Sequence, residues 1–132
     1  MAGGGLMRHI VYDTGALIAA ERRAPDMLSL HDEVTGAGLC PIVPVVVLAQ
    51  AWRGGPQQRL SRLLKGCDIV PDDAAIGRAA GTACGAAGTS DIVDAIVVTT
   101  ALQSNASIVT SDPDDLNRIA GGVSVKLRLY VV

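Results

Sequence analysis

The stretch that decides the fold is Gly88–Asp115, GTSDIVDAIVVTTALQSNASIVTSDPDD. Its hydrophobic side chains are spread around most of the circumference of the helix that the pattern predicts over residues 92–102. A helix without a wide polar face has to be buried, so we expect this helix in the core of the domain. A short β-branched strand is predicted after it, over residues 107–110.

Two aspartates, Asp91 and Asp94, lie near the start of this buried helix. Burying an unpaired carboxylate in such surroundings costs several kcal/mol or forces its protonation. Asp94 therefore needs a partner, and we expect that partner to be a cation.

Short apolar strands and helical segments alternate along the rest of the chain. The pattern predicts further strands over residues 9–12, 39–43, 67–70 and 124–132. Helices are predicted over residues 16–23, 26–34, 45–52, 57–65, 74–87 and 115–120, with a turn at 121–122. This alternation is typical of a three-layer α/β/α domain with a central, mainly parallel β-sheet of about five strands. We expect one domain over residues 8–132, after a flexible glycine-rich arm at residues 1–7.

The composition argues against several classes of protein. The 132 residues are 49% hydrophobic and carry a formal net charge of -2, so a full core is expected and no bulk charge indicates nucleic-acid binding. Only 2% of the residues are aromatic, too few for a base-stacking module. Three cysteines without CxxC spacing favour a reducing cytoplasm over a disulfide framework or a zinc site. We expect no membrane span, which needs roughly 20 apolar residues, and no export signal.

Acidic residues follow two of the predicted strands. Asp13 comes directly after the strand at 9–12, and Asp112 comes two residues after the strand at 107–110. Ligands of open parallel sheets bind beyond the carboxyl ends of the strands, so both carboxylates are expected at one edge of the sheet. Converging carboxylates form a hard-oxygen site suited to Mg²⁺ or Mn²⁺. Such ions activate water and stabilise the leaving oxygen when a phosphodiester is hydrolysed.

Each of these aspartates also has a purely structural interpretation. Asp112 and Asp115, like Asp91 and Asp94, are three residues apart at a predicted helix start, which is the spacing of a capping residue and a first-turn acid. Asp13 has the chemistry to form an Asx-turn. Capping and metal coordination are compatible for Asp112, and the sequence leaves both interpretations open for the others.

Three segments, in their order, resemble a known family: IVYDTGALIAAERR at 10–23, VPVVVLAQAWRGG at 43–55 and GTSDIVDAIVVTTALQSNASIVTSDPDDL at 88–116. Over about residues 8–120 the chain is similar to PIN domains, and more narrowly to VapC-type toxins of bacterial toxin–antitoxin pairs. The resemblance implies a PIN-like fold and a Mg²⁺- or Mn²⁺-dependent endoribonuclease that leaves a 3′-hydroxyl and a 5′-phosphate on RNA. It also implies inhibition by a cognate VapB-type antitoxin and, usually, a homodimer.

Carried over to this sequence, the resemblance implies that Asp13, Asp94 and Asp112 are catalytic metal ligands and that Asp91 is an additional acid. One position departs from the family pattern. The helix after the second strand commonly bears a glutamate, and this chain has Gln50 there. An amide brings no charge to a metal site, so we expect one metal ion to bind tightly and a second to bind weakly or only with RNA.

Other side chains are candidates for auxiliary roles. Glu21, Asp91 or Asp115 would supply a carboxylate in place of the missing glutamate, and Ser111 would contact the metal ligands through its hydroxyl. Basic residues gather in the first half of the chain, whereas aspartates concentrate between residues 91 and 115. Candidate contacts to an RNA backbone or to an acidic antitoxin are Arg22, Arg23, Arg53 and Arg59, for which a solvated helix face is the alternative.

Parts of the sequence are also compatible with three functions other than a nuclease. A PIN-like module without the glutamate would bind RNA or protein without cutting. The Asp13-Thr14-Gly15-Ala16 run also matches the signature of aspartic proteases, which need a second such aspartate in a mostly β framework. A phosphate-accepting receiver domain would need a lysine after a late strand, and the only late lysine, Lys126, falls inside the predicted final strand.

Overall fold

The computed structural model describes residues 9–132. The arm predicted at residues 1–7 lies outside these described residues. In chain order the elements are β1 (Ile10–Tyr12), α1 (Thr14–Glu21), α2 (Pro25–Gly36), β2 (Ile42–Pro44), α3 (Val45–Ala51), α4 (Gln58–Leu64), β3 (Asp68–Val70), α5 (Ala74–Ala87), α6 (Ile92–Ser104), β4 (Ser107–Thr110), α7 (Pro113–Gly122) and β5 (Leu129–Val131).

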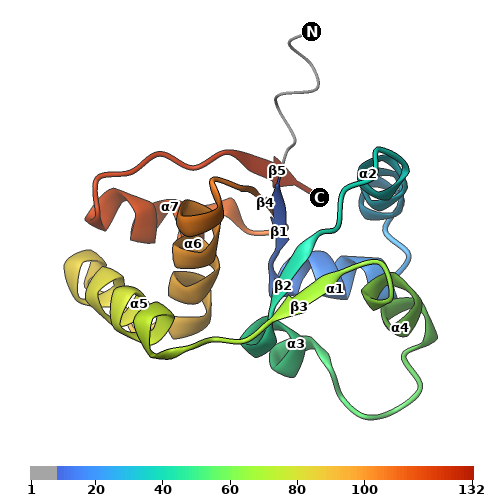
Figure 1. Ribbon diagram of the computed structural model, residues 1–132, viewed down its shortest axis with the longest axis horizontal. Coiled ribbons are helices and arrows are strands. Elements are labelled where there is room, and N and C mark those ends of the chain that lie inside the picture. The colour runs from blue at the N-terminus through green and yellow to red at the C-terminus, as the bar shows by residue number, and fades with distance from the viewer. Residues whose placement is uncertain (1–8) are drawn as a thin grey trace, which may run out of the picture.

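The five strands form one parallel sheet in the order β3-β2-β1-β4-β5. Helices α5, α6 and α7 cover one face of the sheet and helices α1, α2 and α4 cover the other (Figure 1). The predicted three-layer α/β/α architecture is therefore confirmed. An all-parallel sheet between helices also excludes the mostly β framework that an aspartic protease requires.

The strand order reverses between β1 and β4, which pair in register through Ile10–Ser107 and Tyr12–Val109. Both strands are fully buried because helices pack on each face of the sheet. The crevice beyond the carboxyl ends of such a strand pair is where α/β sheets bind ligands. The fold thus places the segments after β1 and β4 side by side, although nearly a hundred residues separate them in sequence.

Helix α6 is buried over seven consecutive residues, 95–101, as the absence of a wide polar face predicted. It packs between the sheet and the two neighbouring helices α5 and α7. Within residues 9–132, no single helix is long and apolar enough to cross a membrane. Only α5 and α6 counted together, as a pair bent by 115°, reach that length and composition.

The end of the chain differs from the prediction. The turn expected at residues 121–122 belongs to α7, and a Cβ at Gly122 would lie only 2.7 Å from the backbone of Ala87. Gly122 is therefore needed for close packing of α7 on α5. Ser124 then adopts a left-handed conformation with φ of 56° and closes the helix, so extended structure cannot begin at residue 124. The final strand is shorter than predicted, Leu129–Val131.

The second strand also begins later than predicted, at Ile42. The N–H of Leu39 donates to the carbonyl of Val34, which ties residue 39 to the C-terminus of α2. The glycine beside it, Gly38, has the positive φ of 82° that this helix ending requires. Leu39 therefore belongs to the end of α2, while the first backbone hydrogen bond toward β3 is made by the carbonyl of Pro41, which accepts the Asp68 N–H at 2.8 Å.

Candidate metal centre

Asp13 lies where β1 ends and α1 begins, and its side chain is buried at 7% exposure. Its Oδ1 atom accepts the N–H of Ala16 at 2.9 Å, so it caps α1. Its own N–H donates to the carbonyl of Val109, which fixes it to the end of β4. Burial raises the pKa of Asp13, and hydrogen bonding from the Thr110 side chain and the helix backbone partly opposes that rise. Asp13 therefore has a structural role as the cap of α1, where the sequence had suggested an Asx-turn.

The end of β4 packs directly against the start of α1. A Cβ at Gly15 would overlap the hydroxyl of Ser111 and would lie 3.2 Å from its backbone nitrogen, so a larger residue would force Ser111 to shift. The Asp112 N–H donates to Oγ1 of the fully buried Thr110 at 3.0 Å. The charge of Asp112 also raises the pKa of Asp13. Asp13 and Asp112 thus lie at the same edge of the sheet, where their strand-end positions predicted them.

Three carboxylates from α6 and α7 approach one another most closely. Asp91, Asp94 and Asp115 each offer an oxygen within 4.8 Å of the others. Asp91 occupies the N-cap position of α6, yet its side chain makes no capping hydrogen bond, and Asp112 at the start of α7 makes none either. The side chains of Asp91 and Asp112 are therefore not used for capping. Asp115, predicted only as an auxiliary residue, belongs to the tightest group.

Asp94 is the centre of the acidic cluster, which we define as Asp13, Asp91, Asp94, Asp112 and Asp115. Its side chain is half-buried, and burial is the largest cause that raises its pKa to about 6. The neighbouring carboxylates add to the rise, in decreasing order Asp115, Asp91, Asp13 and Asp112. Four negative charges therefore act on one partly desolvated carboxyl, and a bound cation would relieve all of them.

The donor set of the acidic cluster suits a particular class of ion. Every candidate ligand is a carboxylate oxygen. Among the described residues, no cysteine or histidine joins the group of Asp91, Asp94 and Asp115. Hard divalent cations such as Mg²⁺ and Mn²⁺ prefer oxygen ligands. The residues present thus fit a magnesium- or manganese-type ion.

Gln50 reaches the cluster from α3. Its Oε1 atom accepts the hydroxyl of Thr14 at 2.6 Å. A cavity of about 280 Å³ opens beside it, lined by Gln50, Ser90, Asp91, Ile92, Val93 and Asp94. The departure from the family pattern therefore lies next to the acids. Sequence reasoning did not single out Thr14 or Ser90, and their only signal was adjacency to Asp13 and Asp91.

Other predicted residues lie away from the cluster. Glu21 ends α1, and its Oε2 atom accepts the Leu60 N–H of α4 at 2.9 Å. Eight helical residues at about 1.5 Å each separate it from Asp13 by roughly 12 Å. Arg53 donates to the carbonyls of Ala49 and Trp52 at the end of α3. The structure therefore does not bring Glu21 to the acids, and Arg53 serves the end of its own helix.

Two of the remaining arginines share a surface. Arg23 and Arg59 line one cavity, whereas Arg22 is the exposed C-terminal cap of α1. Lys126 lines a different cavity, at the C-terminal end of α6, while the acids gather at the N-terminal end of that helix. This placement does not favour a receiver domain, whose lysine would accompany the aspartates.

The fold and the acidic edge define an α/β domain with a carboxylate site at the switch point of a parallel sheet. The profile of the PIN domain matches residues 10–122. The chain therefore belongs to the PIN domain family. No curated protein gave a sequence match.

Solved structures with the same fold come from several bacteria. VapBC2 from Rickettsia felis bound to a promoter DNA fragment is 20% identical, with a TM-score of 0.68 over 93% of this chain and 98% of that chain. A toxin–antitoxin complex from Klebsiella pneumoniae is 16% identical, with a TM-score of 0.70 over 93% and 99%. FitAcB from Neisseria gonorrhoeae is 16% identical, with a TM-score of 0.59 over 92% and 96%. At these identities the likeness establishes a shared fold.

Proposed function

We propose that this chain is a Mg²⁺- or Mn²⁺-dependent endoribonuclease and the toxin of a type II toxin–antitoxin pair. The observation that carries the proposal is the acidic cluster, in which burial and, after it, the neighbouring carboxylates raise the pKa of Asp94 to about 6. Membership of the PIN domain family supports a nuclease. The fold likeness to chains from toxin–antitoxin complexes supports the biological setting.

In the proposed site Asp13, Asp94 and Asp112 hold the cation, and Asp91 and Asp115 complete its surroundings. The bound cation would lower the pKa of a water molecule and offset negative charge on the attacked phosphate. Burial and the Ala16 N–H keep Asp13 in place. Asp91, which makes no capping bond, is free to orient water.

Gln50 is the residue from which we propose how many metal ions the site binds tightly. Its Oε1 atom is already engaged by the Thr14 hydroxyl, and as an amide it adds no charge. We therefore propose one tightly bound cation, with a second that binds weakly or only together with RNA.

Cleavage of total RNA by the purified, antitoxin-free protein tests the nuclease. We expect discrete products with Mg²⁺ or Mn²⁺, none with EDTA, and none from Asp94→Asn. The matched control is Asp114→Asn, because Asp114 is an exposed first-turn acid of α7 outside the acidic cluster. Metal binding without cleavage of any RNA, by a folded protein, would favour a non-catalytic PIN-like module that binds RNA or protein.

A cognate VapB-type antitoxin is the proposed inhibitor. The charge of the acidic cluster suits a cationic side chain, which would displace the metal and stop catalysis. An antitoxin peptide whose basic residues are replaced by glutamine should therefore fail to inhibit. Inhibition that persists without those residues would contradict this route.

A homodimer is proposed from one apolar surface. Val45 and Trp52 of the α3 region are 42% and 41% exposed, and they line an apolar hollow of about 380 Å³ with Leu48, Ala49 and Leu64. Exposed tryptophans are common interface anchors, so Trp52→Ser should shift the protein to monomers in analytical ultracentrifugation.

We assign the protein to the cytoplasm, in keeping with three free cysteines.

A further inference from the structure

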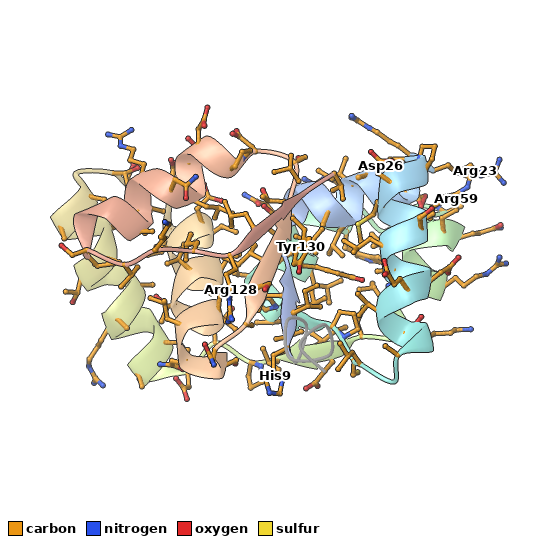
Figure 2. All side chains as sticks on the ribbon, turned by 90° about the horizontal axis from the view of Figure 1, so that it is seen from above. His9, Arg23, Asp26, Arg59, Arg128 and Tyr130 are labelled. Carbon is orange, nitrogen blue, oxygen red and sulfur yellow. The ribbon has the colours of Figure 1, made fainter. Side chains whose placement is uncertain are left out.

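A basic cavity of about 260 Å³ lies at the far end of α1 from Asp13. It is lined by Glu21, Arg23, Pro56, Gln58, Arg59 and Arg62, and we call it the arginine cavity. The labelled Arg23 and Arg59 lie together beyond the start of α2 in Figure 2. Arg59 and Arg62 are three residues apart on α4, so they share one side of that helix. Three arginines, one after α1 and two on α4, therefore line one hollow.

The cavity has a strong positive balance. Glu21 is its only carboxylate, and the Oε2 atom of Glu21 is already bonded to the Leu60 N–H at 2.9 Å. A second cavity, on the α2 side, shares all three arginines and adds one carboxylate, Asp32, and the apolar Leu28 and Leu63. The arginines thus border both cavities, and the arginine cavity has the more polar lining of the two. Planar guanidinium groups match the geometry of phosphate oxygens, which they bind with two parallel hydrogen bonds.

The backbone at Arg23 is unusual for an arginine. Arg23 has a φ of 61°, its N–H donates to the Ala20 carbonyl, and the Ala24 N–H donates to the Ala19 carbonyl. This is a Schellman ending, whose left-handed position glycine normally occupies. The chain uses glycine at the left-handed positions after α2 and α5, Gly38 and Gly88, and the short polar residues Asn105 and Ser124 after α6 and α7. Arginine at the end of α1 is the one long side chain among these positions within residues 9–132, and backbone strain of this kind is found at ligand sites.

The two ends of α1 are suitably spaced for a polyanion. The helix has eight residues, so about 12 Å separates the acidic cluster at its start from the arginine cavity at its end. The acidic cluster repels phosphates until a cation is bound. No aromatic side chain of residues 9–132 lines the arginine cavity. Tyr12 is fully buried, Trp52 belongs to the apolar hollow on α3, and Tyr130 lies on the edge strand β5. Substrate affinity must then come largely from contacts to backbone phosphates.

We infer that the arginine cavity binds a backbone phosphate of single-stranded RNA, a few nucleotides from the phosphate that lies at the acidic cluster. This inference rests on the proposed ribonuclease function and adds to it the residues that hold the substrate. An acidic protein segment is the competing ligand, but the cavity walls next to the arginines offer mainly polar groups, which suit a phosphate.

The experiment measures binding of a fluorescein-labelled single-stranded RNA of mixed sequence by anisotropy. Ca²⁺ replaces Mg²⁺ so that a cation neutralises the acidic cluster, and a gel of the same samples checks that the RNA stays intact. The variants are Arg23→Gly, Arg59→Gln and Arg62→Gln in the full chain. Arg23→Gly suits this test because glycine relieves the strain at that position, so lost binding cannot be ascribed to unfolding. The matched control is Arg78→Gln, an exposed arginine on α5 at the opposite face of the sheet.

Each variant of the arginine cavity should weaken RNA binding by about three- to tenfold and lower the slope of log affinity against log salt by about 0.7. Arg78→Gln should change neither quantity. Binding of labelled poly-glutamate, which stands for an acidic protein segment, is measured in parallel. The inference would be overturned if all three variants kept their RNA affinity or if the unaltered protein bound no RNA. It would also be overturned if the variants lost poly-glutamate binding but kept RNA binding. Failure of the nuclease proposal gives a different pattern, in which RNA binding depends on the arginines but Mn²⁺ produces no cleavage.

Discussion

The two ends of α1 carry opposite charges, and both signs agree with the helix dipole. The helix dipole does not explain how many charged residues gather at each end of α1. At the start, one capping bond from Asp13 satisfies the helix, yet four more carboxylates gather there. At the end, Arg22 already supplies a cation, yet Arg23 adds a strained backbone. The helix does not need the additional carboxylates at its start or the strained Arg23 at its end. These additional charges therefore indicate a metal site at the start of α1 and a phosphate site at its end.

The two ends differ in how their charges are held. Asp13 and Asp94 are crowded and partly desolvated, so their charged state is unfavourable until a cation arrives. The arginines are exposed and keep most of their hydration. Substitutions at the acidic end should therefore alter catalysis, metal binding and stability, whereas those at the basic end should alter substrate affinity.

The largest expected contrast is kinetic. Asp94→Asn should lower kcat for RNA cleavage by more than about a hundredfold, because even groups that only support metal ligands cost 10–100-fold. Arg59→Gln should leave kcat unchanged and raise KM several-fold, since it removes binding that is equal in the ground and transition states. Steady-state kinetics on a labelled RNA measure both. A fall in kcat for Arg59→Gln equal to that for Asp94→Asn would erase the distinction between the two ends.

The acidic end should also depend on a close backbone contact. Gly15→Ala should lower the free energy of unfolding by about 1–3 kcal/mol, because the new Cβ overlaps Ser111. Gly81→Ala is the control, since Gly81 lies within α5 with open space around its Cα, and alanine there should stabilise by up to about 1 kcal/mol. Urea denaturation followed by circular dichroism measures both changes. Equal effects of the two substitutions would show that the Gly15–Ser111 contact is unimportant.

Stability of the metal-free protein should decrease as the pH rises. The pKa of Asp94 is raised from 3.8 to about 6, so the folded protein holds this proton more tightly than the unfolded chain. Its stabilising effect is fully present below 3.8 and is lost as the pH rises through about 6. Melting temperatures in EDTA should therefore fall between about pH 4 and about pH 6.5 and level off above that range. Mn²⁺ should reverse the fall, and a profile equally steep in Asp94→Asn would assign it to other groups.

The smallest effect is expected at the basic end. Arg23→Gly should raise the free energy of unfolding by up to about 1 kcal/mol, because glycine adopts the left-handed conformation without penalty. Gly38→Ala, at the equivalent position after α2, should lower it by a similar amount. Chemical denaturation of the two variants measures both changes in the free energy of unfolding. A destabilised Arg23→Gly protein would mean that the arginine side chain contributes to folding.

The sequence predicted those parts of the fold that depend on local pattern. The apolar circumference of residues 92–102 identified the buried helix α6, and the β-branched run after it identified β4. Alternation of strands and helices was sufficient for the parallel sheet. The pattern could not show that Gly122 serves helix packing, because the contact with Ala87 joins residues far apart in the chain.

Prediction of the site was limited in the same way. Strand ends and the family resemblance led us to predict Asp13, Asp94 and Asp112 as ligands, which stays a prediction. Proximity in space decides which acids lie closest together. Asp115 joins Asp91 and Asp94 because α6 and α7 pack side by side. Arg62 was not among the predicted contacts, since only the docking of α4 against the end of α1 brings it to Arg23.

Calorimetric titration of the metal-free protein with Mn²⁺ tests the central claim most directly, because it measures the acidic cluster without needing the correct RNA. The account predicts one tight site in the unaltered protein and in Asp114→Asn, and loss of that site in Asp94→Asn. Two equally tight sites, no binding at all, or unchanged binding in Asp94→Asn would contradict it.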